Sequence, residues 1–441
     1  MQVEIPIGHK VLPAILPDGQ VAGVCTPGAL TRASDPAALA RDRVAAGLAA
    51  AGIAARAAAP HARACIVVTD RTRSTPLGLI VPILLDQLNA LGVPDDRITI
   101  ISGGGMHAPD TGPDLLRTLG PAVLDRVQAC TDEPDNDAAM IGLGTTALGT
   151  AVELHRRFVE ADIRIGVTNV TPCMLAGWSG GGKIVLPGVA SRRTIYQNHR
   201  HFVGALAALR CASLMGVMPP DNLVRADIEE TATIAKIDMV VNTVLDRRQQ
   251  LVDLFCGDQV TAQRAAVARM APQVEVSLPE RVDLLIAGVG DPALEVSLFQ
   301  GGSRVCGGAD RYLKPGGTLV MVNACEEGIY EGFEHEGYRE WMRCMPVPAE
   351  IGRLVADGAM GGEKGCVLYT FAWLLREMRC RIIVVTGGMT RAELKDVHLD
   401  HAATVQEAVD EALASYNRPS IGVMPYGGLV LPVLPVRPFA G

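Results

Sequence analysis

The fold of this 441-residue chain is decided by the stretch CIVVTDRTRSTPLGLIVPILLDQLNALG, residues 65–92. It opens with a short run rich in β-branched residues, which is typical of a buried strand. A polar segment follows as far as Pro76, and the long apolar segment after it is typical of a crossover helix. The order strand, loop, helix predicts one unit of an α/β fold.

The same order recurs along the first part of the chain. Further strands are expected at ITIISGGG (98–105), IRIGVTNV (163–170) and IDMVVNTVL (237–245), and a helix is expected to begin near Pro113. Alternating strands and helices imply a mostly parallel sheet that is covered by helices.

A second α/β series follows a helical segment that ends near Pro272. Its expected strands are VDLLIAGVG (282–290), GTLVMVNAC (317–325) and RIIVVTGG (381–388). The last apolar stretch, 421–434, is a further strand that suits either sheet.

The fold class predicted is therefore α/β, with two Rossmann-like domains whose sheets are largely parallel. We expect an N-terminal domain at 1–275 and a C-terminal domain at 276–441, joined by a hinge that lets them close over a cleft.

The composition excludes several classes of function. The net charge is −8, and the basic residues are scattered, so neither nucleic acid nor an anionic membrane is an expected partner. The N-terminus lacks the pattern of a secretion signal, and no stretch is long enough to span a membrane, so we expect a cytoplasmic protein. The 11 cysteines include no CxxC pair and are an odd number, which predicts reduced thiols that mostly fill the core.

Polar side chains follow three of the expected strands. Asp70 and Arg73 come after CIVVT, His107 after ITIISGGG, and Cys173 after IRIGVTNV. Ligands of open α/β sheets bind where loops leave the carboxyl ends of strands. We therefore expect these three loops to converge on one site.

A glycine-rich loop carries the most distinctive lysine of the chain. Gly177 to Lys183 has the spacing of a phosphate-binding P-loop, but Ile184 stands where that motif needs a hydroxyl, and Pro187 opposes the helix that should follow. Three consecutive glycines, 180–182, still permit backbone to approach a ligand closely. A phosphate or a covalently attached cofactor would suit this loop.

Seven sequence blocks, in this order, resemble the nickel-pincer lactate racemases over nearly the whole chain. They are DRTRSTP (70–76), GGGMHAP (103–109), AGWSGGGKIVLPG (176–188), NHRH (198–201), SLFQ (297–300), VNACEEG (322–328) and MPYGGLVLP (424–432). Each block alone is weak, but their shared order is specific. The resemblance implies a 2-hydroxy acid racemase or epimerase that transfers a hydride reversibly to a nickel pincer nucleotide. It also implies dependence on the enzymes that build this cofactor: a carboxylase/hydrolase, a sulfur transferase and a nickel insertase.

The resemblance assigns roles to individual residues. Lys183 would tether the cofactor, His199 would bind nickel, as imidazole does well, and His107 would act as general base. It places Asp70, Thr72, Gly180, Gly181 and Gly182 at the cofactor, and Arg73, Trp178, Phe299, Gln300 and Ser303 at the substrate.

Three positions depart from the family pattern. Cys173 replaces a second catalytic histidine, Ser303 replaces a lysine that grips the substrate carboxylate, and Phe299 replaces a tyrosine. Cys173 is either a base, if nearby cations lower its pKa, or an inert pocket thiol. The loss of a cation and a hydroxyl predicts a substrate other than lactate, with Arg71, Arg73 or Arg304 restoring the charge.

Other functions remain open at this level. The same cofactor would also suit an oxidoreductase that transfers hydride on one face only. A zinc-dependent hydrolase or lyase would use His107, His199 and His201. A carrier that only sequesters the cofactor would need no general base.

Overall fold

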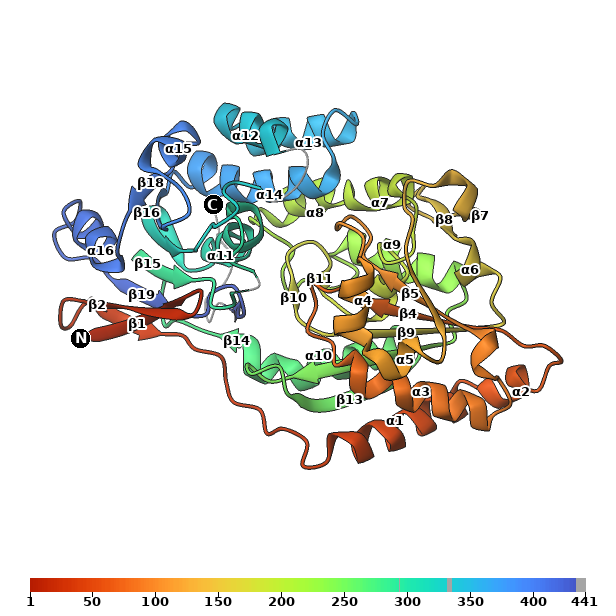
Figure 1. The fold of residues 1–441 in the computed structure, drawn as a ribbon. Coiled ribbons are helices and arrows are strands. Elements are labelled where there is room, and N and C mark those ends of the chain that lie inside the picture. Colours follow the sequence, from red (N-terminus) through yellow and green to blue (C-terminus); the bar gives the residue numbers. More distant parts are fainter. Residues whose placement is uncertain (293, 331–334, 434–441) are drawn as a thin grey trace.

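The computed structural model describes residues 1–292, 294–330 and 335–433. It contains two six-stranded sheets, each flanked by helices (Figure 1). The predicted α/β class with largely parallel sheets is confirmed. Residues 434–441 of the expected second domain, including the end of its last strand segment, lie outside the described residues.

The first sheet has the strand order β13-β12-β9-β4-β5-β6. Its strands are β4 (Ala64–Thr69), β5 (Ile98–Gly103), β6 (Gln128–Thr131), β9 (Ile163–Asn169), β12 (Met239–Leu245) and β13 (Leu251–Gly257). All neighbours pair in parallel except β13, which is antiparallel to β12. The strands predicted at 65–69, 98–105, 163–170 and 237–245 are therefore confirmed.

Helices bury both faces of this sheet. Along β4, Ile66 and Val68 pack in the same core cluster as the apolar side chains of α1 (Pro36–Ala50) and α3 (Leu77–Ala90). Val67 points to the other face, into the cluster that includes Ile228 of α9 (Leu223–Ile234). Because successive strand side chains alternate between faces, a continuous apolar run needs cover on both sides.

The second sheet has the order β18-β17-β16-β15-β19-β3, and all of its neighbours are parallel. Its strands are β3 (Val21–Val24), β15 (Val282–Gly288), β16 (Leu313–Val322), β17 (Arg381–Val385), β18 (Asp400–Ala402) and β19 (Ile421–Met424). The last long strand therefore stays in the second sheet. Beyond it, β20 (Leu431–Pro432) pairs with β14 (Glu275–Val276), next to the expected boundary.

The N-terminal residues pack differently from the expected division at residue 275. The hairpin of β1 (Gln2–Ile7) and β2 (Lys10–Ile15) shares a core cluster with β15 and β16, and β3 pairs with β19. The first 24 residues therefore belong with the second sheet, and the chain crosses to the first sheet before α1 (Figure 1). We propose that a hinge joins the two parts of the chain built on these sheets.

The remaining elements form the connections. They are β7 (Met140–Thr145), β8 (Ala151–His155), β10 (Pro172–Cys173), β11 (Gly177–Trp178), α2 (Ile53–Ala57), α4 (Gly112–Leu119), α5 (Pro121–Leu124), α6 (Arg156–Val159), α7 (Arg192–His199), α8 (Phe202–Leu209), α10 (Thr261–Val274), α11 (Ser303–Ala309), α12 (His335–Cys344), α13 (Pro348–Ala356), α14 (Gly362–Ala372), α15 (Arg391–Asp396) and α16 (Val405–Leu413). All 11 cysteines are free thiols, as predicted. Within the described ranges, no helix combines the length and apolar character needed to cross a bilayer.

A fully buried arginine on α9 braces the glycine-rich loop. The Arg225 guanidinium donates hydrogen bonds to the carbonyls of Gly180 (3.0 Å) and Ser179 (3.3 Å) and pairs with Glu229 (3.3 Å). Buried carbonyls and charges are costly when they lose such a partner. Arg225 therefore fixes the loop from which Lys183 projects.

We expect Arg225→Met to lower the free energy of unfolding by about 3 kcal/mol, because it leaves the two loop carbonyls unpaired. Arg264→Met is the matched control, since Arg264 pairs with the same Glu229 (2.7 Å) but is one-third exposed. We expect that change to cost less than about 1 kcal/mol. Urea unfolding measures both, and equal losses would contradict this account of the loop.

Candidate active site

Two of the predicted loops meet around a buried carboxylate. Asp70, just after β4, has its Oδ2 2.8 Å from Nδ1 of His107, just after β5. The Thr72 hydroxyl donates to Oδ1 of Asp70 at 2.9 Å and lies 3.3 Å from the same histidine nitrogen. The carboxyl ends of adjacent strands thus bring three of the predicted residues together.

The charge of Asp70 fixes the orientation of His107. Burial would raise the pKa of Asp70, but the hydrogen bond and charge of His107 and the charge of Arg73 outweigh it and lower this pKa. An ionised carboxylate only accepts hydrogen bonds, so Nδ1 of His107 must donate. Nε2 is then the ring nitrogen available to exchange a proton, and among the described residues it has no partner.

The third loop brings Cys173 to Lys183. A short antiparallel pairing of β10 with β11 folds the chain back, and the Lys183 Nζ donates to the Cys173 Sγ at 3.6 Å. Burial would raise the pKa of Cys173, but the Lys183 ammonium, the N–H groups of Ala176 and Leu175, and Arg304 lower it to about 6. Cys173 is therefore a thiolate at neutral pH, and among the described residues it is the one hydrogen-bonding partner of the Lys183 amine.

His199 ends α7 as a buried neutral imidazole. Burial and the nearby Lys183 charge lower its pKa to about 3, and its buried Nδ1 has no hydrogen-bond partner among the described residues. Asn198 anchors the helix through a hydrogen bond to Asp227 (2.8 Å). On the other side α14 closes over it, because a Cβ at Gly362 would lie 2.7 Å from that of His199.

These residues fit the group that the sequence implies. A neutral imidazole with an unpaired nitrogen is the form that binds a transition metal. An amine beside a thiolate that can take its proton suits covalent attachment. Lys183 and His199 are close enough for the charge of one to shift the pKa of the other.

The zinc alternative is not assembled. His107 is held by Asp70, and Nε2 of His201 lies 3.1 Å from the Thr150 hydroxyl. Across the described ranges, no three His, Cys, Asp or Glu side chains are placed to hold a metal ion.

Packing within the protein accounts for the three glycines of the loop. Gly180 and Gly181 have φ of 81° and 59°, and Cβ atoms there would lie 2.7 Å from Asn242 Oδ1 and 2.5 Å from the Gln259 carbonyl. A Cβ at Gly182 would lie 2.7 Å from Gln259 Oε1. The next helix is α7, which begins at Arg192, so the P-loop architecture is absent as predicted. A contact of these glycines with a cofactor stays a prediction.

The predicted substrate residues of the second domain lie around a π-helical turn, Leu298–Gly302. Phe299 is buried, with its ring edge-to-face against Tyr330 (4.8 Å) and Tyr338 (5.0 Å). The buried Ser303 hydroxyl donates to the carbonyl of Gln300 (3.1 Å). Neither Phe299 nor Ser303 therefore offers a polar group that is free for a ligand.

Trp178 does not have the predicted place in the pocket. Its ring is 2% exposed and packs in a core cluster with Val170, Met215 and Leu431. A tryptophan in a glycine-rich loop suggested a ligand contact, but distant apolar side chains cover it. It does not line the cleft described next.

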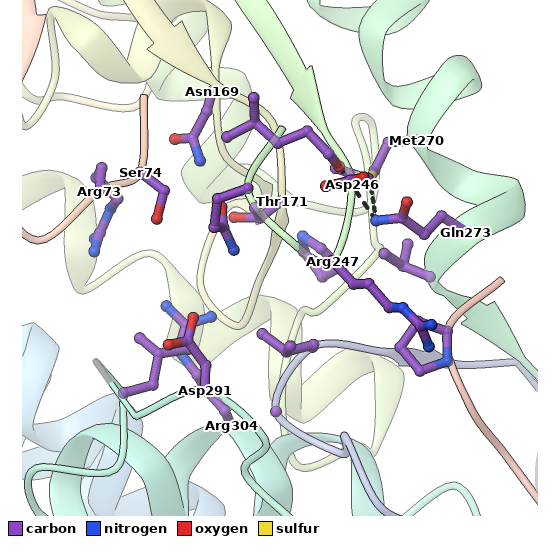
Figure 2. A pocket seen from close by; sticks show the side chains of 18 of the residues that line it. Arg73, Ser74, Asn169, Thr171, Asp246, Arg247, Met270, Gln273, Asp291 and Arg304 are labelled. Atoms are coloured by element: carbon purple, nitrogen blue, oxygen red, sulfur yellow. Dashed lines mark hydrogen bonds between the residues drawn. The ribbon is translucent and has the colours of Figure 1, made fainter. Parts of the chain in front are cut away.

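A cleft of about 750 Å³, including its mouth, lies between the two sheets. Figure 2 shows Arg73 and Ser74 on one wall, Asp291 and Arg304 near them, and Arg247 and Gln273 at the far end. Thr72 and Arg73 line the cleft and belong to the same loop as Asp70. Pro172 also lines the cleft, whereas its neighbour Cys173 and Lys183 do not.

Two of the three arginines considered from the sequence line the cleft. Arg71 turns away to Asp110 (3.1 Å), whereas Arg73 and Arg304 both line the cleft. The sequence prediction missed Asn169, whose buried Oδ1 has no partner among the described residues and which also lines the cleft. Its place as the last residue of β9, at the carboxyl end of the sheet, is the signal by which the sequence could have identified it.

Comparison with known proteins shows similarity to lactate racemases. Residues 7–209 match the sequence model of the lactate racemase N-terminal domain. The lactate racemase of Lactiplantibacillus plantarum is 27% identical over 82% of this chain and 83% of its own length. That of Thermoanaerobacterium thermosaccharolyticum is 24% identical over 97% of this chain and 98% of its own.

Two solved structures share the fold. The lactate racemase apoprotein from Thermoanaerobacterium thermosaccharolyticum has a TM-score of 0.83 and 23% identity, covering 98% of this chain and 100% of its own. A protein from Thermotoga maritima has a TM-score of 0.66 and 17% identity, covering 89% and 98%. The sequence matches, the shared fold and the seven ordered blocks agree: residues 7–209 match the lactate racemase N-terminal domain, and the chain as a whole is similar in sequence and in fold to lactate racemases, which are isomerases.

Proposed function

We propose that the chain is a nickel-dependent racemase or epimerase of a 2-hydroxy acid. The observation that carries the proposal is the arrangement of Lys183, beside the Cys173 thiolate, near the neutral, buried His199 with its unpaired nitrogen. Lys183 would tether a nickel pincer nucleotide and His199 would hold its metal. When bound, this cofactor accepts a hydride from the α carbon and returns it, which avoids removing a very weakly acidic proton beside a carboxylate.

His107 would exchange the proton of the substrate hydroxyl. Asp70 holds Nδ1 of the ring, so Nε2 takes the proton as hydride leaves and gives it back on return. Arg73, in the same loop as Asp70, would grip the substrate carboxylate with two parallel hydrogen bonds.

Cys173 would serve as the second proton-transfer group. Reaction in both directions requires proton transfer to hydroxyl groups in both orientations. Attachment of the cofactor would remove the Lys183 charge. The N–H groups of Ala176 and Leu175 and the charge of Arg304, which also lower the pKa of Cys173, would then favour its thiolate as the base.

The substrate would be a hydroxy acid other than lactate. Position 303 carries no cation and its hydroxyl is engaged with the backbone, while Phe299 presents an aromatic ring to two tyrosines. The resemblance places both residues at the substrate, so the site we propose is less polar at these two positions than the family pattern. The proposal includes dependence on the carboxylase/hydrolase, sulfur transferase and nickel insertase that make the cofactor.

Production of the protein together with those three enzymes tests the function. We expect an intact mass increased by a covalent group on Lys183, and conversion of either enantiomer or epimer of the preferred hydroxy acid into the mixture in chiral chromatography. Lys183→Arg should remove both signals. Full activity with an unmodified Lys183 would end the proposal, and conversion of one form only, into a 2-oxo acid, would favour the one-faced oxidoreductase.

We expect Asp70→Asn to lower kcat by about 100-fold, because the amide no longer enforces the His107 tautomer. Asp114→Asn is a matched control, because Asp114 is a nearby carboxylate that contacts Arg71 and Thr111 and not His107. Unchanged kcat in Asp70→Asn, measured by loss of optical rotation, would contradict the role given to His107.

We expect the alkylation of Cys173 by iodoacetamide to follow a thiol pKa near 6, so that its rate falls tenfold per pH unit below that value. Lys183→Gln removes the neighbouring ammonium and should move the midpoint above pH 8. The exposed Cys344, whose pKa is raised by desolvation and by Glu340, is the reference thiol in the same peptide map, because its pKa is shifted in the opposite direction. A Cys173 profile that does not respond to Lys183→Gln would refute the ion pair.

A further inference from the structure

One arginine of the cleft is not accounted for by the residues assigned so far. Arg304 follows Ser303 directly, at the start of α11, and its side chain reaches the cleft (Figure 2). It forms no hydrogen bond or ion pair with any described residue of the chain. The structure therefore places a cation one residue beyond the position where the family pattern has one.

Arg304 lies close to a second arginine from the other sheet. Burial and then the charge of Arg73 lower the pKa of Arg304 to about 10, against the opposing effects of Cys173 and Asp291. Arg73 follows β4 of the first sheet, and its own hydrogen bonds go to the carbonyl (3.2 Å) and hydroxyl (3.0 Å) of Thr72. Neither guanidinium is hydrogen-bonded to a carboxylate of the described residues.

Two guanidinium groups that repel each other in a cleft form a receptor for an anion. Each can offer two parallel N–H donors to the two oxygens of a carboxylate. An anion between them relieves the repulsion and stabilises both charges. The flanking Cys173 thiolate and Asp291 carboxylate offset part of the positive charge, so that a single negative group suffices.

We propose that Arg304 and Arg73 bind the same substrate carboxylate from opposite walls of the cleft, with Arg304 supplying the cation that is absent at position 303. This inference rests on the proposed function, because it names the residue that selects the substrate acid. Since the two arginines belong to different sheets, the carboxylate also holds the two halves of the molecule together. The contact makes Arg304 a specificity-determining residue of the site.

Oxamate, a planar analogue of a 2-oxo acid, tests this by calorimetry on the protein as purified, without cofactor. We expect wild-type protein to bind it and Arg304→Gln to weaken the affinity by about tenfold or more, as the loss of a charged hydrogen-bonded pair does. Arg304→Lys should fall between, because a point charge lacks the paired donors. Arg247→Gln, at the far end of the same cleft, is the matched control and should bind like wild type.

The double variant separates one shared ligand from two independent sites. If both arginines hold one carboxylate, the losses in Arg73→Gln and Arg304→Gln should not add up in the double variant. Simple additivity, unchanged affinity in Arg304→Gln, or no oxamate binding by wild type would overturn the proposal. Inorganic phosphate serves as a second probe. The proposal would also be overturned if Arg304→Gln weakened the binding of phosphate but not that of oxamate.

Kinetics of the cofactor-loaded enzyme distinguish this proposal from the proposed function. We expect Arg304→Gln to raise KM by about tenfold or more while kcat changes less, because the contact is made to the bound substrate as well as in the transition state. If Arg304→Gln loses oxamate binding but the cofactor-loaded wild-type enzyme racemises no hydroxy acid, the proposed function is wrong and the carboxylate site is still supported. If the enzyme racemises its substrate and KM is unchanged in Arg304→Gln, the proposed function is supported and the carboxylate site is wrong.

Discussion

The chemistry of this site depends on an ammonium and a thiolate held 3.6 Å apart, those of Lys183 and Cys173. The ammonium stabilises the charge of the thiolate in a place where burial alone would neutralise it. Burial keeps His199 neutral, and the same ammonium adds to this effect, because a second positive charge nearby is unfavourable. Before a cofactor is attached, the charge of Lys183 thus favours the ionised form of the candidate second base and the neutral form of the candidate metal ligand.

The fold supplies this pair through two separate restraints. The β10–β11 hairpin returns the chain so that Cys173 and the glycine-rich loop are adjacent, and Arg225 and Asn242 hold that loop from below through Gly180 and Gly181. The glycines are required because side chains at these positions would collide with the polar groups that fix the loop. The rigidity of the loop therefore comes from buried polar contacts of the first domain, while α14 packs over His199.

Much of this was predictable because the governing signals are local. β-Branched runs such as 65–69 predict buried strands. Polar residues directly after such runs predict the edge of the sheet at which Asp70, His107 and Cys173 lie. Strand β3 gave no such signal, since it is short and half-exposed, and its pairing partner β19 lies about 400 residues away in sequence. Strands β1 and β2 pair with each other, but the sheet on which they pack is equally remote in the chain. Trp178 was misplaced for a similar reason, because Met215 and Leu431, which cover it, are remote in the chain. The choice among Arg71, Arg73 and Arg304 depended on the direction of long side chains, which only tertiary contacts fix.

Diffraction data collected on either side of the nickel absorption edge, from crystals of protein made together with the cofactor enzymes, test the central claim most directly. The account predicts an anomalous peak within bonding distance of a His199 ring nitrogen, and electron density continuous from the Lys183 Nζ. A structure with free Lys183, an intact Lys183–Cys173 ion pair and no nickel, from a preparation that is fully active, would contradict it.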